Sequence, residues 1–132
     1  MSAKRENLST GSHFEKTYGY SRAVKVGEQV FVSGTVGLNY DTGVMPEDPV
    51  EQFKQSVANI ERALGMAGAK LAEVVTLTVY ISDPAIMQLI GPSLSQTFGP
   101  VGPTNTAVVV GFPVPEIKIE LQVMAIIGCS PA

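Results

Sequence analysis

The sequence IKIELQVMAII, residues 117–127, decides the fold. Every odd position from Ile117 to Ile127 is apolar, whereas the even positions begin with Lys, Glu and Gln. Because successive side chains of a β-strand point to opposite faces, this alternation predicts a long strand with one buried face. The polar side chains on the other face make this strand a candidate location for a functional site.

A second β-rich segment, residues 105–110 (NTAVVV), precedes this strand. The connection, residues 111–116 (GFPVPE), contains two prolines, which have no amide hydrogen for the hydrogen-bond ladder of a sheet. The two strands are therefore expected to break here and turn back as a hairpin. In this interpretation the candidate site lies on two adjacent strands.

The chain has 132 residues, enough for one domain with a single core. Residues 1–17 are polar and unpatterned, and we interpret them as an N-terminal arm that is loose unless a partner fixes it. Residues 18–132 are predicted to form one domain. No apolar run approaches the roughly 18 residues of a membrane span, and the N-terminus lacks an apolar signal segment. Together with the single Cys129, this predicts a cytoplasmic protein without membrane contact.

Charge and residue counts exclude several classes of function. The net charge of −3 and the isoelectric point near 5.0 argue against a nucleic-acid partner. With only His13 and Cys129 of their types, a His-activated nucleophile and a His- or Cys-rich metal site are not expected. The sequence also lacks glycine-rich phosphate and dinucleotide motifs. We therefore expect no cofactor and no metal.

The first half of the domain is predicted to be a hairpin followed by a loop. Residues 19–26 and 29–33 are rich in β-forming residues and are separated by the turn signal Gly27-Glu28. Ser33-Gly34-Thr35 is expected at the end of the second strand. Residues 38–47 contain Asn, Asp, Gly and Pro, which is typical of a loop.

Two helices are predicted, each introduced by an Asp-Pro pair. The first begins with Asp48 as the cap and Pro49 at the first helical position, and it ends at Gly68. Its apolar stripe consists of Val50, Phe53, Val57, Ile60, Leu64 and Ala67. The second follows Asp83-Pro84, and Gly91-Pro92 is expected to kink it or divide it into two short segments.

Residues 74–81 (VVTLTVYI) are predicted to form a strand between the two helices. The expected order is thus β-β-α-β-α-β-β, an α+β domain with one sheet. Two helices with one apolar stripe each can cover only one face of that sheet. The other face must be wet or meet another subunit, and its Val and Thr content favours the subunit.

Glu120 is the most informative candidate residue. In the middle of a strand its burial would raise the pKa of its carboxyl group and let it orient or activate a water molecule. The alternative is a solvated strand residue paired with Lys118 or with a cross-strand partner. Arg22 is either the holder of an anionic ligand or a surface arginine.

Four further residues are candidates for binding. Ser33 and Gly34 offer hydroxyl and amide donors to a carboxylate, or they form only a turn at the end of a strand. Asn105 binds a ligand amide or caps a turn. Tyr20 shares strand parity with Arg22, so both can face one cleft, although packing is the simpler role for a tyrosine.

The ordered set of these segments resembles the reactive-intermediate deaminase (Rid) family, also called YjgF-like and often labelled endoribonuclease L-PSP. The resemblance covers residues 15–128 and rests on residues 19–24 (GYSRAV), residues 32–34 (VSG) and residues 118–120 (KIE). It also includes Ala67-Gly68 at the end of the first helix and residues 124–126 (MAI). The resemblance implies a chorismate-mutase-like fold, a homotrimer, and a small-molecule ligand in each inter-subunit cleft.

The resemblance also implies a chemistry: hydrolysis of enamines and imines formed from amino acids, without a cofactor. In this family a glutamate orients water, and a tyrosine and a Ser-Gly segment line the cleft; Glu120, Tyr20, Ser33 and Gly34 match. The arginine that holds the substrate carboxylate is replaced by Asn105, and the position of a small thiol residue is Ala107.

Two classes of function are therefore expected. The first is a deaminase whose substrate lacks the α-carboxylate, or in which Arg22 replaces the missing cation. The second is a non-catalytic trimer that binds a small metabolite or a partner protein. A ribonuclease, the reading that follows from the family label alone, conflicts with the acidic charge.

Overall fold

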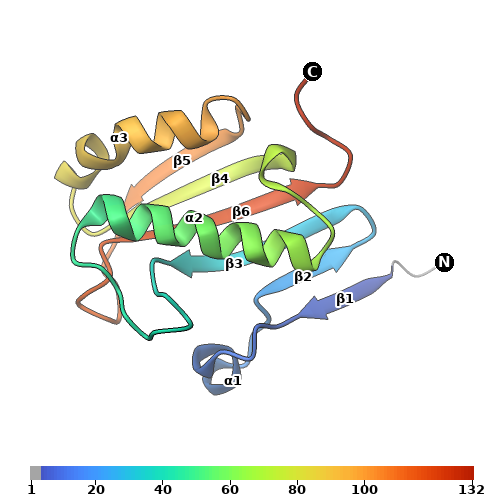
Figure 1. The fold of residues 1–132 in the computed structure, drawn as a ribbon, viewed down its shortest axis with the longest axis horizontal. Helices are drawn as coiled ribbons and strands as arrows, with labels where there is room; N and C mark the ends of the chain where they lie inside the picture. The colour runs from blue at the N-terminus through green and yellow to red at the C-terminus, as the bar shows by residue number, and fades with distance from the viewer. Residues whose placement is uncertain (1–3) are drawn as a thin grey trace.

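Strand β6 (Ile119–Ile126) lies inside the sheet of this computed structural model, which describes residues 4–132 (Figure 1). The side chains at its odd positions are at most 3% exposed, whereas those between them are partly or fully exposed. The alternation predicted from the sequence is therefore confirmed. It places polar residues of β6, including Glu120, on the face of the sheet opposite the core.

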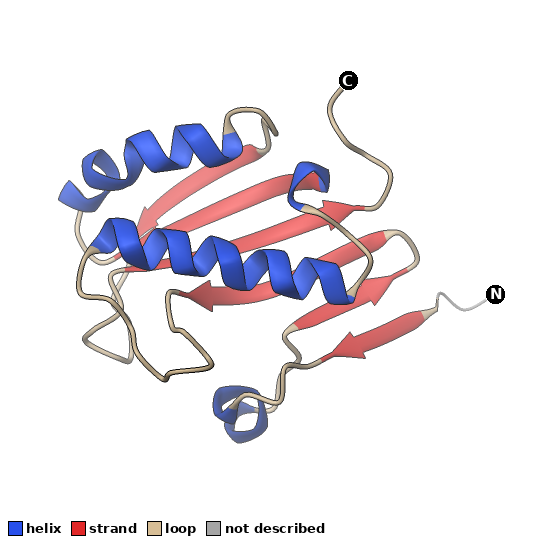
Figure 2. Cartoon of the chain, viewed as in Figure 1, coloured by secondary structure: helices blue, strands red, loops and turns tan. Residues whose placement is uncertain are grey.

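Six strands form this sheet in the order β1-β2-β3-β6-β4-β5 (Figure 2). Strands β4 and β5 are parallel, and every other neighbouring pair is antiparallel. The remaining strands are β1 (Arg5–Leu8), β2 (Ala23–Val26), β3 (Gln29–Val36), β4 (Val74–Ile81) and β5 (Thr104–Val109).

The hairpin expected between the last two strands is wrong. Strand β4 lies between β5 and β6, so these two strands are not neighbours. The prolines of residues 111–116 do end a strand, as predicted, but the chain then crosses to the other side of β4. Strand β6 is buried on its core face and has hydrogen-bonded partners on both edges, β3 and β4, which places it away from the sheet edge.

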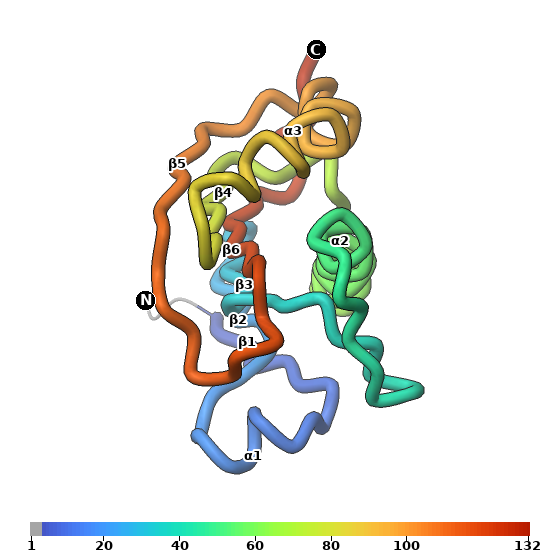
Figure 3. The backbone as a smooth tube through the Cα atoms, turned by 90° about the vertical axis from the view of Figure 1, so that its left-hand side faces the viewer, coloured from blue at the N-terminus to red at the C-terminus, as the bar shows by residue number. Residues whose placement is uncertain are grey.

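Two long helices, α2 (Pro49–Met66) and α3 (Ala85–Phe98), cover one face of the sheet, and the opposite face carries no other element of the described chain (Figure 3). The predicted cap is confirmed, because the Asp48 carboxylate accepts a hydrogen bond from the amide of Val50 at 2.8 Å. Except for the half-buried Val50, the predicted stripe of α2 is buried. The α+β fold with both helices on one face is therefore as predicted.

Helix α3 continues through Pro92, so the expected division into two segments is wrong. Its start is as predicted, since the Asp83 carboxylate accepts a hydrogen bond from the amide of Ala85 at 2.8 Å. Burial of Ile90 and Phe98 on either side of the proline holds both halves of the helix on the core. Tertiary packing here outweighs the loss of one helical hydrogen bond.

The N-terminal arm is not loose where the structure describes it. Residues Arg5–Leu8 form the edge strand β1, and His13–Tyr18 form the short helix α1. The buried carboxylate of Glu15 in α1 accepts hydrogen bonds from the hydroxyl groups of Ser9, Thr10 and Ser12, which lie between the two elements, at 2.6–2.7 Å. The sequence shows no periodicity here because these polar contacts, and not an apolar stripe, hold the segment.

No helix of the described residues is long and apolar enough to cross a membrane.

Candidate active site

A β-bulge in β3 forms the base of the candidate site. Val32 pairs with Val123 and Thr35 pairs with Leu121, so Ser33 and Gly34 together lie opposite one residue of β6. The expected turn at the end of a strand is therefore a bulge inside a strand that continues to Val36. The strand continues past the bulge because Thr35 and Val36 pair with Leu121 and Glu120 of β6. Bulges of this kind often redirect side chains near active sites.

The carboxylate of Glu120 lies directly against Gly34. A methyl group added to the Cα atom of Gly34 would collide with Oε1 of Glu120. Burial raises the pKa of Glu120 above the ordinary 4.5, and the nearby charge of Arg22 lowers it in part. The expected pairing with Lys118 is absent, because the Lys118 ammonium group donates instead to the carbonyl of Glu47.

Arg22 is 3% exposed, so the interpretation as a surface arginine is wrong. Its guanidinium group donates to the Gly34 carbonyl at 2.7 Å and to the Tyr40 hydroxyl at 3.2 Å. It also lies 5.6 Å from the centre of the Tyr20 ring, a cation–π contact. The third nitrogen, Nε, is buried without a hydrogen-bond partner among the described residues. Arg22 therefore fixes the bulge that supports Glu120.

Ser33 and Tyr20 lie beside this arginine, although Tyr20 and Arg22 precede β2 and do not share the predicted strand. The Ser33 hydroxyl donates to the carbonyl of Ser21 at 2.7 Å, so only its oxygen is left to accept a hydrogen bond from a ligand. Tyr20 is 39% exposed, and burial of its hydroxyl end raises its pKa above 10.0. Both residues line a surface cavity of about 580 Å³ next to β2.

A second cavity, of about 390 Å³, opens directly on Glu120. Its walls are predominantly apolar and aromatic, and they come from α1, β3 and the connection between β5 and β6. The residues other than Glu120 are Phe14, Tyr18, Val36, Phe112, Pro113, Val114 and Ile117. Apolar surroundings of this kind explain the raised pKa of Glu120 and suit a ligand with an apolar substituent.

Within one chain, Asn105 and Ala107 do not lie near Glu120. They pair with Leu77 and Val79, whose side chains face the helices, whereas Glu120 pairs with Tyr80 on the opposite face. Asn105 instead lines a cavity of about 300 Å³ beneath α3. A shared site with Glu120 would require a second copy of the chain, and this remains a prediction.

Sequence reasoning missed the residues that surround Glu120 from elsewhere in the chain. Phe14 lies in the segment interpreted as an arm and Tyr18 directly after it, and their spacing on α1 was the available signal. Tyr40 lies in a predicted loop and carried no signal of its contact with Arg22. Within residues 4–132, no group of three or more His, Cys, Asp or Glu side chains is placed to share a metal ion.

The sheet, covered by two helices on one face, defines an α+β protein of the chorismate-mutase-like class, in which a half-buried glutamate lies against a β-bulge. The chain belongs to the Rid (YjgF-like) family, because the family model described as Endoribonuclease L-PSP matches residues 10–127.

Similar proteins agree with this assignment. A RutC family protein of Pyrococcus abyssi is 36% identical over 107 residues, covering 80% of this chain and 84% of that protein. The 2-iminobutanoate/2-iminopropanoate deaminase of Escherichia coli is 26% identical over 110 residues, covering 81% and 86% of the two chains. The crystal structure of Rv2704 from Mycobacterium tuberculosis, a member of the YjgF/YER057c/UK114 family, superposes with a TM-score of 0.85 at 35% identity. That superposition covers 94% of this chain and 100% of the other.

Proposed function

We propose that this protein hydrolyses a reactive imine or enamine to a carbonyl compound and ammonia, with Glu120 as the acid–base group. The observation that carries the proposal is the carboxylate of Glu120, half-buried beside an apolar cavity, with a raised pKa and no protein hydrogen bond among the described residues. Such a carboxylate is free to hold a water molecule and to exchange protons with it. Relatives named 2-iminobutanoate/2-iminopropanoate deaminase support the same reaction class.

An enamine first becomes an imine when a proton moves from its nitrogen to its carbon. Hydrolysis of the imine then needs one water molecule and a series of proton transfers. Glu120 takes a proton from water as the water oxygen attacks the imine carbon, and the electron pair of the carbon–nitrogen double bond moves to nitrogen. Nitrogen receives this proton from Glu120. The second proton of the water follows the same route when the carbon–nitrogen bond breaks, so that a carbonyl group forms and ammonia leaves.

The proposed substrate has apolar substituents and no α-carboxylate. Asn105 is neutral and cannot make the charged fork that an arginine makes with a carboxylate. Arg22 does not replace it, because two of its three nitrogens already donate to Gly34 and Tyr40 and the third is buried. The apolar walls around Glu120 favour an aliphatic or aromatic group instead.

The test compares two imines generated in the assay, one from an apolar amino acid by an amino-acid oxidase and one from the matching amine by an amine oxidase. Ammonia release should be faster for the imine without a carboxylate. Glu120→Gln should reduce turnover by about 10²–10⁴-fold, since positioned acid–base groups contribute that much. The exposed carboxylate of Glu116, four residues earlier, provides the matched control Glu116→Gln, which should keep full activity.

Turnover that survives Glu120→Gln would exclude the proposed mechanism. Saturable binding of both imines without hydrolysis would favour the alternative function, a non-catalytic trimer that binds a small metabolite.

A further inference from the structure

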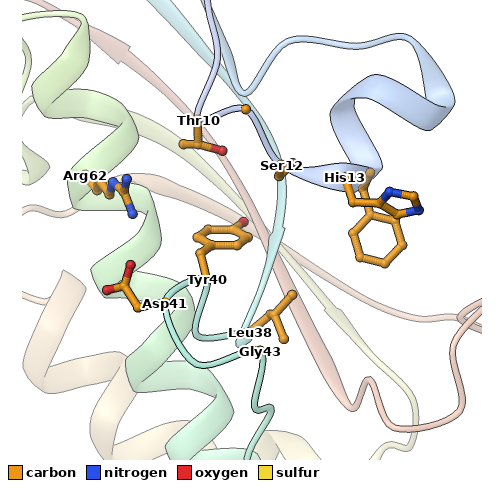
Figure 4. Close-up of a pocket in the computed structure, with 10 residues that line it drawn as sticks. Thr10, Ser12, His13, Leu38, Tyr40, Asp41, Gly43 and Arg62 are labelled. Carbon is orange, nitrogen blue, oxygen red and sulfur yellow. The ribbon is translucent and has the colours of Figure 1, made fainter.

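A further cavity, of about 430 Å³, lies between α1, the loop after β3, and α2 (Figure 4). We call it the loop pocket; it is lined by Thr10, Gly11, Ser12, His13, Phe14, Leu38, Tyr40, Asp41, Gly43 and Arg62. Its volume is within the range of roughly 300–1,000 Å³ that is usual for small-ligand sites. It does not contain Glu120 and plays no part in the proposed reaction.

Hydrogen bonds fix the part of the loop pocket that is formed by the loop after β3 and by α2. Asn59 of α2 donates to the carbonyls of Val36 and Leu38 at 3.0 and 2.8 Å, which ties the loop to the helix. The side chain of Asn39 accepts from the amide of Asp41 at 2.9 Å. Arg22 holds the hydroxyl of Tyr40. A cavity with fixed walls needs little ordering when a ligand binds, and this favours affinity.

Arg62 and Asp41 carry opposite charges on these walls, and neither is paired with another side chain of the described residues. Arg62 lies one helical turn after Asn59, and Asp41 lies on the same side of the pocket in Figure 4. Both are exposed, and among residues 4–132 neither makes an ion pair or a side-chain hydrogen bond with protein; the one ion pair joins Lys54 and Glu51. Beside them the Tyr40 ring and Leu38 supply apolar surface.

We propose that the loop pocket binds a small zwitterion, an α-amino acid with an apolar side chain. Arg62 would hold its carboxylate in a two-point contact, and Asp41 would hold its ammonium group. An anion alone would be repelled by Asp41 and a cation alone by Arg62, so the charge pair selects a ligand that carries both. The apolar side chain would lie against Leu38 and Tyr40.

The test uses leucine and two truncated analogues, 4-methylpentanoate without the amine and 3-methylbutylamine without the carboxylate. Chemical shifts of the Gly11 and Gly43 amides report on the loop pocket, and the shift of Gly34 reports on the site of Glu120. Leucine should move Gly11 and Gly43 with a dissociation constant of about 1 mM. Each analogue should bind at least tenfold more weakly.

Arg62→Met and Asp41→Asn should each weaken leucine binding at least tenfold. Both positions are exposed, and methionine is a good helix former, so the remaining amide signals should report an intact fold. Lys54→Met, an exposed cation of α2 outside the pocket, should bind leucine as the wild type does. Equal binding of leucine and 4-methylpentanoate, shifts confined to Gly34, or no shift at about 10 mM leucine would each overturn the proposal.

Discussion

Gly34 and Glu120 lie so close together that any side chain at position 34 would occupy the space of the Glu120 carboxylate. The backbone of Gly34 has no positive φ that would require glycine, so the requirement is one of space alone. Arg22 holds the Gly34 carbonyl from the other side at 2.7 Å. The bulge, the arginine and the glutamate therefore form one unit.

This contact predicts that Gly34→Ala reduces turnover without destabilising the fold. The new methyl group meets the flexible end of Glu120, which can swing away, and a displacement of about 1 Å at a reacting group can cost about 10²-fold in rate. Ammonia release and thermal unfolding measure the two effects. At Gly37, by contrast, a methyl group would collide with the backbone of Gln52, so Gly37→Ala should cost about 1–3 kcal/mol of stability. A destabilised Gly34→Ala protein with normal turnover per folded molecule would contradict the prediction.

Glu15 should contribute to stability in a pH-dependent way. Burial raises its pKa, but hydrogen bonds from Ser12, Thr10 and Ser9 outweigh this and lower the value from 4.5 to about 2. A depressed pKa gives stability that is present above pH 4.5 and is lost as pH falls toward about 2. Glu15→Gln should therefore reduce the free energy of unfolding by about 2–3 kcal/mol at pH 7.

Urea unfolding at several pH values measures this difference, which should shrink steadily below pH 4.5. Glu6→Gln is the matched control, because Glu6 is exposed in the neighbouring strand β1. A difference that stays constant down to pH 2 would show that the lost contacts are not those of the charged carboxylate.

The pH dependence of turnover should identify the influence of Arg22. Glu120 acts as a base only when ionised, so the rate should rise with pH through its pKa. Since the charge of Arg22 lowers that pKa, Arg22→Gln should move the rising limb of the rate profile to higher pH. Arg22→Lys keeps the charge and should leave the limb in place while lowering the rate, because lysine lacks the fork that reaches both Gly34 and Tyr40. Equal displacement of the limb in both variants would contradict an electrostatic role.

The sequence predicts the helices and strands of this fold well, but it does not predict which strands lie next to each other in the sheet. The alternation of residues 117–127 and the cap at Asp48 are local signals, and both are confirmed. The position of β6 between β3 and β4 depends on pairings between residues as distant as Gln29 and Ile126, which no local pattern encodes. The prolines before β6 indicate a break but not where the chain goes afterwards.

The candidate site shows the same limit. The polar face of β6 indicates Glu120. Tyr20 and Arg22 do lie in contact, but the predicted strand parity is not the reason, because β2 begins only at Ala23. Burial of Arg22 could not be predicted, because its partners are a backbone carbonyl of β3 and the hydroxyl of Tyr40 in a loop. Phe14 and Tyr18 were missed because the polar contacts of Glu15, which have no periodicity, hold α1, and the spacing of the two aromatic residues was the only signal of a helix.

The uncovered face of the sheet predicts a homotrimer. Val24, Phe31, Met124 and Thr76 lie side by side across four strands on this face, and Phe31 is 42% exposed in the isolated chain. Light scattering at micromolar concentration should give three times the 13.9 kDa of one chain. Phe31→Glu should lower this mass, whereas Leu89→Glu, a 55% exposed position on α3, should not. A folded wild-type monomer would contradict the prediction and, with it, any site shared between subunits.

Asn105→Arg should give the protein activity toward imines that carry an α-carboxylate. Asn105 faces away from Glu120 in its own chain, so the gain requires the arginine to reach the site of a neighbouring subunit in the trimer. A charged hydrogen bond of about 1.5–3 kcal/mol corresponds to a gain of roughly 10- to 100-fold in kcat/KM. Asn105→Gln is the matched control, because it lengthens the side chain without adding charge, and it should give no gain. The imine without a carboxylate should be hydrolysed equally by all three proteins, since it offers the arginine nothing to bind. A similar gain on both imines would show that the arginine changes the shape of the site and does not bind the carboxylate. No gain in a folded trimer would show that the cleft differs from the clefts of related deaminases at more than this residue.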